Sequence, residues 1–147
     1  MVPTWRRKWR ARCDWSWNAV VVRADLEIWQ KLNVTAFLVS GIGTVQPDVI
    51  GEPYVDASER HYLPMFGYPV LVYAGDAEAL TRAFRRAQDR DLATAVYTDD
   101  LFATYNDVDN RAAVAKVATA DLQLAGFAVA GDRRDVDKAL DKLKLHP

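Results

Sequence analysis

Four short apolar runs, divided by stretches of helical spacing and by one long loop, constrain the fold of this 147-residue chain more than any other feature. Runs of this length, rich in valine and alanine and bounded by turn residues, are typical of buried strands. Strands that alternate with helices predict one α/β domain. We expect a three-layer α/β/α fold with a four-stranded sheet that is mixed but largely parallel. The predicted strands are Asn18–Ala24, Val70–Tyr73, Leu92–Tyr97 and Leu124–Ala130.

Helical spacing follows the predicted strands. Asp25 is expected to cap a helix that ends at Gly41 and Gly43, and Asp76 is expected to open a strongly amphipathic helix. Residues 111–120 have a helical pattern, whereas the polar residues 106–110 before them are predicted to interrupt it. A last helix is marked by three apolar positions: Val136, Leu140 and Leu143.

Residues 45–69 hold four of the six prolines and are predicted to form a loop, with a small hairpin within Tyr54–Leu63. Residues 61–69 bring five large apolar side chains into this loop: Tyr62, Leu63, Met65, Phe66 and Tyr68. Because loops usually stay on the surface, such a segment predicts an interface patch, and we expect a homodimer. The alternative, that the segment covers the core of its own domain, stays open.

Composition excludes several classes of site. The chain has one cysteine, Cys13, so it can form no internal disulfide and no cysteine-based metal cluster. His61 and His146 are its only histidines, so we expect no metal site, and we expect no cofactor. No run reaches the roughly 18 apolar residues of a membrane span. The basic residues 6–8 are not followed by an apolar segment, so we expect a cytoplasmic protein.

Residues 1–16 form a basic, tryptophan-rich N-terminal segment that differs from the rest of the chain. Residues 17–147 form the predicted single domain. Residues 1–13 carry five basic and no acidic side chains. Arginine mixed with tryptophan suits nucleic-acid backbones, through charge and stacking, and also anionic membrane surfaces. The alternative is a leader with no binding role.

Longer strings carry a family resemblance that covers about residues 18–147. Three stretches resemble the opening, the central helix and strand, and the closing strand and helix of type II peptidyl-tRNA hydrolases: Val20–Leu26, Asp76–Asp100 and Gly126–Pro147. Four strings resemble a bacterial family placed on the same fold, domain of unknown function 2000: WQKLNVTAF (29–37), IGEPY (50–54), YLPMF (62–66) and LKLHP (143–147). The resemblance implies the peptidyl-tRNA hydrolase type II fold.

The resemblance also implies candidate catalytic residues. The hydrolase family uses a lysine and a glutamine one helical turn apart, an aspartate, and a threonine four residues later. Asp100 and Thr104 match the last pair in spacing. With a one-residue deletion after Asp25, Lys31 matches the lysine, and Thr35 stands where the family has glutamine. A second family threonine is missing, so we expect weak or absent peptidyl-tRNA hydrolysis.

Elementary chemistry gives these four residues roles in cleaving an ester or amide, which needs an activated water and a stabilised oxyanion. Asp100 can orient water, Lys31 can supply positive charge, and Thr35 and Thr104 can donate hydrogen bonds. The structural alternatives are a helix-capping Asp100, a solvated Lys31, and a Thr35 hydroxyl bonded to the carbonyl one turn earlier.

Ligand-binding candidates follow from the rule that sites in α/β sheets lie beyond the carboxyl ends of strands. That rule selects Arg23–Asp25 after the first predicted strand and Thr98–Thr104 after the third. The ligand-binding candidates are Asp25, Thr98 and Asp99 in these ranges, and Asn33, a polar position on the helix after the first strand. Three functions stay open: a hydrolase of an ester or amide, RNA-linked or not; a non-catalytic binder of a small ligand, nucleotide or tRNA; and an oligomeric structural protein.

Overall fold

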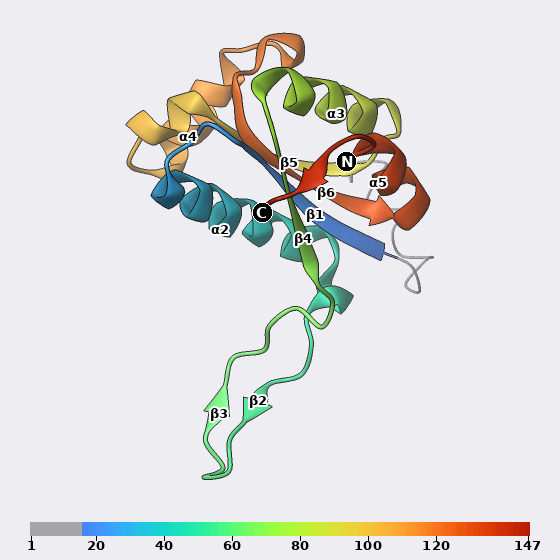
Figure 1. The fold of residues 1–147 in the computed structure, drawn as a ribbon. Coiled ribbons are helices and arrows are strands. Elements are labelled where there is room, and N and C mark those ends of the chain that lie inside the picture. The colour runs from blue at the N-terminus through green and yellow to red at the C-terminus, as the bar shows by residue number, and fades with distance from the viewer. Residues whose placement is uncertain (1–15) are drawn as a thin grey trace, which may run out of the picture.

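A five-stranded sheet forms the centre of the protein, of which this computed structural model describes residues 16–147 (Figure 1). The N-terminal segment predicted over residues 1–16 lies outside the described residues, except for Ser16, where the first strand begins. The strands are β1 (Ser16–Arg23), β4 (Val70–Gly75), β5 (Ala93–Thr98), β6 (Leu124–Asp132) and β7 (Lys144–Leu145).

The strands are ordered β5-β6-β1-β4-β7, and this order corrects the expected sheet. The expected mixed sheet is confirmed. The expected four strands and largely parallel pairing are wrong, because β7 adds a fifth strand and only the pair β1–β4 is parallel. The long strand β6 lies antiparallel between β1 and β5. Strands β1, β4 and β5 therefore point the same way, and their carboxyl ends share one edge of the sheet.

Helices cover the two faces of the sheet unevenly. Helix α2 packs on one face against β1, β5 and β6, and α3 and α5 pack on the other; α4 contacts η2. The three-layer expectation therefore holds only in outline. The helices are α2 (Ile28–Val45), α3 (Ala77–Asp89), α4 (Asp107–Ala115) and α5 (Arg133–Ala139), with 3-10 turns η1 (Pro47–Val49), η2 (Asp99–Ala103) and η3 (Thr119–Asp121).

Strand β1 supplies both halves of the core because its side chains alternate between the two faces. Ala19 and Val21 pack in the cluster with α3 and α5, and Val20 and Val22 pack in the cluster with α2. All four are fully buried. Full burial of a valine contributes roughly 1.5–3 kcal/mol, so this strand needs helices on both faces.

Local capping corrects two predicted boundaries. Helix α2 is capped by Glu27 in a capping box with Gln30, so the expected Asp25 cap is wrong. Helix α4 begins at Asp107 because the Asn106 side chain accepts a hydrogen bond from the Asp109 backbone N–H, at 2.9 Å. Residues 106–110 therefore start a helix instead of interrupting one, as an asparagine cap with acids in the first turn favours.

The predicted hairpin is confirmed and projects from the body as an arm, here residues 50–66 (Figure 1). Its strands are β2 (Tyr54–Val55) and β3 (His61–Tyr62), and every residue from Ile50 to Met65 is exposed. Only Phe66, at the base, packs against the core cluster of α2. The alternative that residues 61–69 cover their own domain is thus limited to that one ring.

Gly126 of β6 lies where no side chain fits. A Cβ there would come within 2.7 Å of the Val21 carbonyl oxygen and 2.8 Å of the Val34 Cγ1. We predict that Gly126→Ala lowers the free energy of unfolding by about 1–3 kcal/mol, because backbone and core must both shift. The matched control is Gly43→Ala in α2, whose Cβ would meet Phe66 at 3.7 Å and should leave stability equal or higher. Urea unfolding of both variants measures the difference, and equal midpoints would contradict this account.

Candidate functional site

Arg23, at the carboxyl end of β1, joins three strands at the edge where the expected site residues lie. Its Nη1 donates to both carboxylate oxygens of Asp99, at 2.8 and 3.0 Å, and to the Leu124 carbonyl at 3.0 Å. Its Nε donates to Asp25 at 2.7 Å. Burial would lower the pKa of Arg23, but the hydrogen bonds and charges of Asp25 and Asp99 outweigh it, and the pKa is raised. The guanidinium therefore stays charged and holds the ends of β1, β5 and β6 together.

This network occupies two of the expected ligand-binding residues. Asp99 accepts both hydrogen bonds from one side of the guanidinium, and its backbone N–H donates to the Gln123 carbonyl at 2.9 Å. Asp25 pairs with the other side while its side chain remains 75% exposed. The third expected residue, Thr98, is only 2% exposed, and its hydroxyl has no partner among residues 16–147. Asp25 is therefore the most accessible of the three.

Lys31 and Asp100 lie at the same end of the sheet. The rings of Trp29 in α2 and Phe102 in η2 meet edge to face at 6.0 Å, which brings the elements that carry Lys31 and Asp100 together. Lys31 is half-buried and Asp100 is exposed. Within the described part of the chain neither forms an ion pair or hydrogen bond through its side chain, so both charges are available.

The two expected threonine donors are already engaged. The Thr35 hydroxyl donates to the Lys31 carbonyl one turn earlier, at 2.8 Å. The Thr104 hydroxyl lies 2.9 Å from the Leu101 carbonyl and also contacts the Asn110 side-chain oxygen. A hydroxyl has one proton to donate, so neither threonine offers a free donor to an oxyanion in this arrangement.

Beside these residues lies a group of four rings, here called the aromatic shelf, that sequence reasoning missed as a unit. Tyr97 is nearly buried and packs between Phe37, at 5.9 Å, and Phe102, at 5.1 Å. Trp29 and Phe37 keep 60% and 56% of their surface exposed. Asn33 lies between them on α2 and donates to the Tyr97 hydroxyl at 3.4 Å. The positions 29, 33 and 37 are four apart, a spacing that places them on one line of the helix.

The shelf is an apolar surface whose contacting rings are inclined to one another by 52–75°, with polar groups at its margin. Tyr97 has a raised pKa because of burial, so its hydroxyl stays protonated at neutral pH. Charged side chains at this end are two basic and four acidic: Arg23, Lys31, Asp25, Glu27, Asp99 and Asp100. Residues 16–147 contain no group of three histidine, cysteine, aspartate or glutamate side chains placed to hold a metal ion. They also contain no helix long and apolar enough to cross a membrane.

An α/β domain with a mixed five-stranded sheet and a projecting hairpin is the class that the fold defines. The chain belongs to the family described as Protein of unknown function (DUF2000), whose model matches residues 18–147. Among solved structures it is similar to the protein of unknown function Atu0240 from Agrobacterium tumefaciens strain C58. The two are 41% identical, with a TM-score of 0.87 over 90% of this chain and 98% of that one. No curated protein matches the chain. The family expected from the sequence is thereby confirmed.

The Arg23 network gives a stability prediction. Arg23→Met keeps much of the side-chain volume but leaves Asp99 without its partner and the Leu124 carbonyl without a donor. We expect a loss of about 2–3 kcal/mol in the free energy of unfolding. Arg82→Met is the control, because Arg82 forms an exposed ion pair with Glu78 on one helix and should contribute less than about 0.5 kcal/mol. Urea titration compares the two variants. Equal losses in the free energy of unfolding would show that Arg23 stabilises the fold no more than an exposed arginine does.

Proposed function

We propose that the chain is a binding protein that holds a small, flat, neutral or cationic ligand on the aromatic shelf and does not hydrolyse it. The observation that carries the proposal is the exposure of Trp29 and Phe37 on either side of Asn33, above the nearly buried Tyr97. Exposed rings bind the flat face of an aromatic ligand, and an amide at their centre offers a hydrogen bond that sets its orientation.

Charge sets the class of ligand. The end of the sheet that carries the aromatic shelf has two more acidic than basic side chains, so it attracts a cation and repels an anion. The same holds for the described body as a whole. The chain has a net charge of −1, and residues 1–15 contribute +5 − 1 = +4, which leaves −5 for residues 16–147. A body with this charge disfavours a nucleotide or tRNA as its ligand.

A hydrolase of an ester or amide is the second candidate. It is favoured by Lys31 and Asp100, which lie at one end of the sheet with their charges unpaired within the described region. We also propose the peptidyl-tRNA hydrolase type II fold, on the strings that resemble that family. The engaged hydroxyls of Thr35 and Thr104 favour binding over hydrolysis, since the oxyanion would lack both expected donors. A homodimer and a cytoplasmic location stay part of the proposal.

Ligand binding is tested with three probes that share one ring and differ in charge: tryptamine, indole and indole-3-acetate. We predict that affinity falls in that order in calorimetric titrations at low salt, because the shelf binds the ring and the surrounding acids favour the cation. Trp29→Ala should weaken tryptamine binding by about tenfold.

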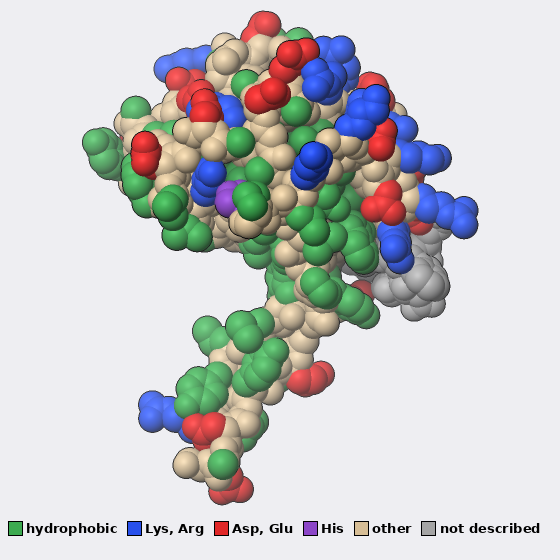
Figure 2. Space-filling view, in the orientation of Figure 1, with side chains coloured by type: hydrophobic (Ala, Val, Ile, Leu, Met, Phe, Trp, Pro, Cys, Tyr) green, Lys and Arg blue, Asp and Glu red, His purple; other side chains and the backbone are tan. Residues whose placement is uncertain are grey.

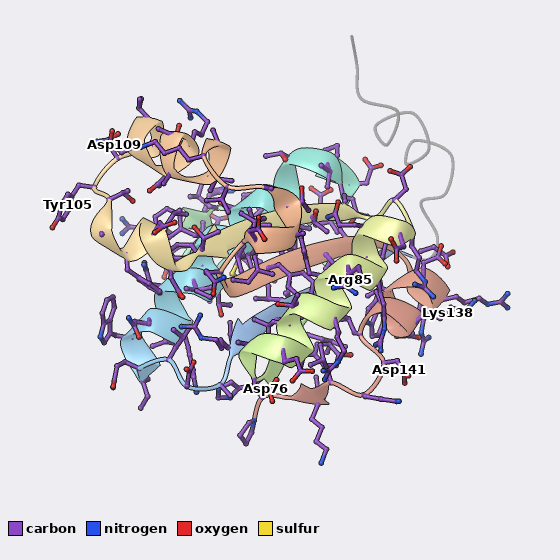
Figure 3. All side chains as sticks on the ribbon, turned by 90° about the horizontal axis from the view of Figure 1, so that it is seen from above. Asp76, Arg85, Tyr105, Asp109, Lys138 and Asp141 are labelled. Atoms are coloured by element: carbon purple, nitrogen blue, oxygen red, sulfur yellow. The ribbon has the colours of Figure 1, made fainter. Side chains whose placement is uncertain are left out.

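The matched control is Tyr105→Ala, because Tyr105 is 96% exposed and projects away from the domain beside α4 (Figure 3). This variant should bind tryptamine as the native chain does. Equal affinities for all three probes, or equal affinity of Trp29→Ala and the native chain for tryptamine, would contradict ligand binding on the aromatic shelf.

Hydrolysis is tested separately on labelled peptidyl-tRNA and on a p-nitrophenyl ester. We predict no rate above that of buffer for either substrate. Asp100→Asn and Lys31→Met serve as controls, because a rate that depends on the proposed chemistry must fall in both. A rate that is clearly above buffer and is lost in both variants would replace the first proposal with the second.

A further inference from the structure

We propose that the arm of one copy of this chain docks on the exposed apolar face of α2 in a second copy, and that the contact is reciprocal. The interface goes beyond the binding function proposed above and does not depend on it. On α2, Ile28 and Leu32 follow one line of the helix, and the shelf residues Trp29, Asn33 and Phe37 follow the neighbouring line.

The arm is preorganised although it contacts little of its own body. At its tip, Asp56 accepts hydrogen bonds from the backbone N–H of Ser58 and Arg60 and from the Tyr62 hydroxyl, at 2.8–3.0 Å. The same hydrogen bonds, chiefly that from Arg60, lower the pKa of Asp56. At its base, the Gly51 N–H donates to the Met65 carbonyl at 2.8 Å. A two-stranded hairpin alone in water is only marginally stable. Because hydrogen bonds order the tip and the base of this hairpin, we infer that another surface covers the strands between them.

The arm carries large apolar side chains into solvent along its whole length. Leu63 is 86% exposed and Met65 is 61% exposed, whereas most large apolar groups outside the arm are buried or half-buried. Tyrosine, methionine and aromatic side chains are the types enriched at protein interfaces. The other exposed members are Ile50, Tyr54, Val55 and Tyr62.

Helix α2 offers the second unpartnered surface. Its 18 residues include a single charged side chain, Lys31, and none of its seven exposed residues is charged. Ile28 is 77% exposed and Leu32 is 67% exposed. A helix that is apolar on most sides is normally covered, so this face needs a partner. Figure 2 shows hydrophobic side chains both on the body near α2 and along the arm.

Length and size favour a second copy as the occupant. One leg of the arm, residues 50–57, spans about 26 Å, and α2 spans about 27 Å. Sixteen exposed arm residues and the five exposed α2 residues outside the shelf give 16 + 5 = 21 residues a side, within the roughly 20–30 of a standard interface. A two-fold pair buries both surfaces in both copies without a third molecule.

Sedimentation equilibrium of the full chain at tens of micromolar tests the interface. The native chain should have a mass of 2 × 16.5 = 33 kDa. Leu63→Asp in the arm and Leu32→Asp on α2 should each raise the dimer dissociation constant by about tenfold or more, because each buries an unpaired charge. The matched control is Val108→Asp on α4, which is 67% exposed like Leu32 and should stay dimeric.

Two results of that experiment overturn the proposal. A native chain of 16.5 kDa would show that the arm has no second copy to bind. A dimer that Leu63→Asp weakens and Leu32→Asp leaves intact would show that the arm docks elsewhere.

A cross-linking experiment covers the case in which a charged variant fails to fold. In a Cys13→Ser background, chains with Leu63→Cys are mixed with differently tagged chains that carry Leu32→Cys, and the mixture is oxidised. We expect a mixed disulfide dimer, and much less when Val108→Cys replaces Leu32→Cys. Equal yields for both mixtures overturn the docking of the arm on α2, whatever the behaviour of the charged variants.

Discussion

Burial of β1 on both faces is the constraint on which the rest of the structure depends. Val20, Val21 and Val22 are fully buried on alternate faces, so the sheet is stable only with α2 on one side and α3 with α5 on the other. The same strand ends in Arg23, whose guanidinium joins β5 and β6 through Asp99 and the Leu124 carbonyl. The core and the site edge are therefore built on one strand.

The chemistry at that edge follows from how its polar groups are divided. Arg23 engages Asp25 and Asp99, and the threonines engage nearby carbonyls. What remains open to solvent is aromatic surface, with Lys31 and Asp100 nearby. Donors that already form hydrogen bonds within the fold are not available to stabilise a transition state. For that reason the arrangement favours ligand binding over hydrolysis.

The exposed apolar surfaces share one physical cause. Helix α2 buries only one line of side chains, led by Val34, Leu38 and Ile42, yet its other lines are also apolar. The arm leaves the body between α2 and β4 and has no core of its own. Apolar area that a monomer leaves in water is a driving force for association, which a second copy can satisfy.

The sequence by itself determined the element types, because the β-branched run before Ala24 and the amphipathic repeat after Asp76 are local patterns that physical periodicity governs. It also determined the family and the hairpin. Only the tertiary structure decided the strand order, since the pairing of β6 with β1 joins residues more than 100 positions apart. The engagement of Arg23 with Asp99 and the ring contact of Trp29 with Phe102 depend on that order. Spacing along one chain cannot predict which distant side chains meet, because it does not specify which strand ends share an edge.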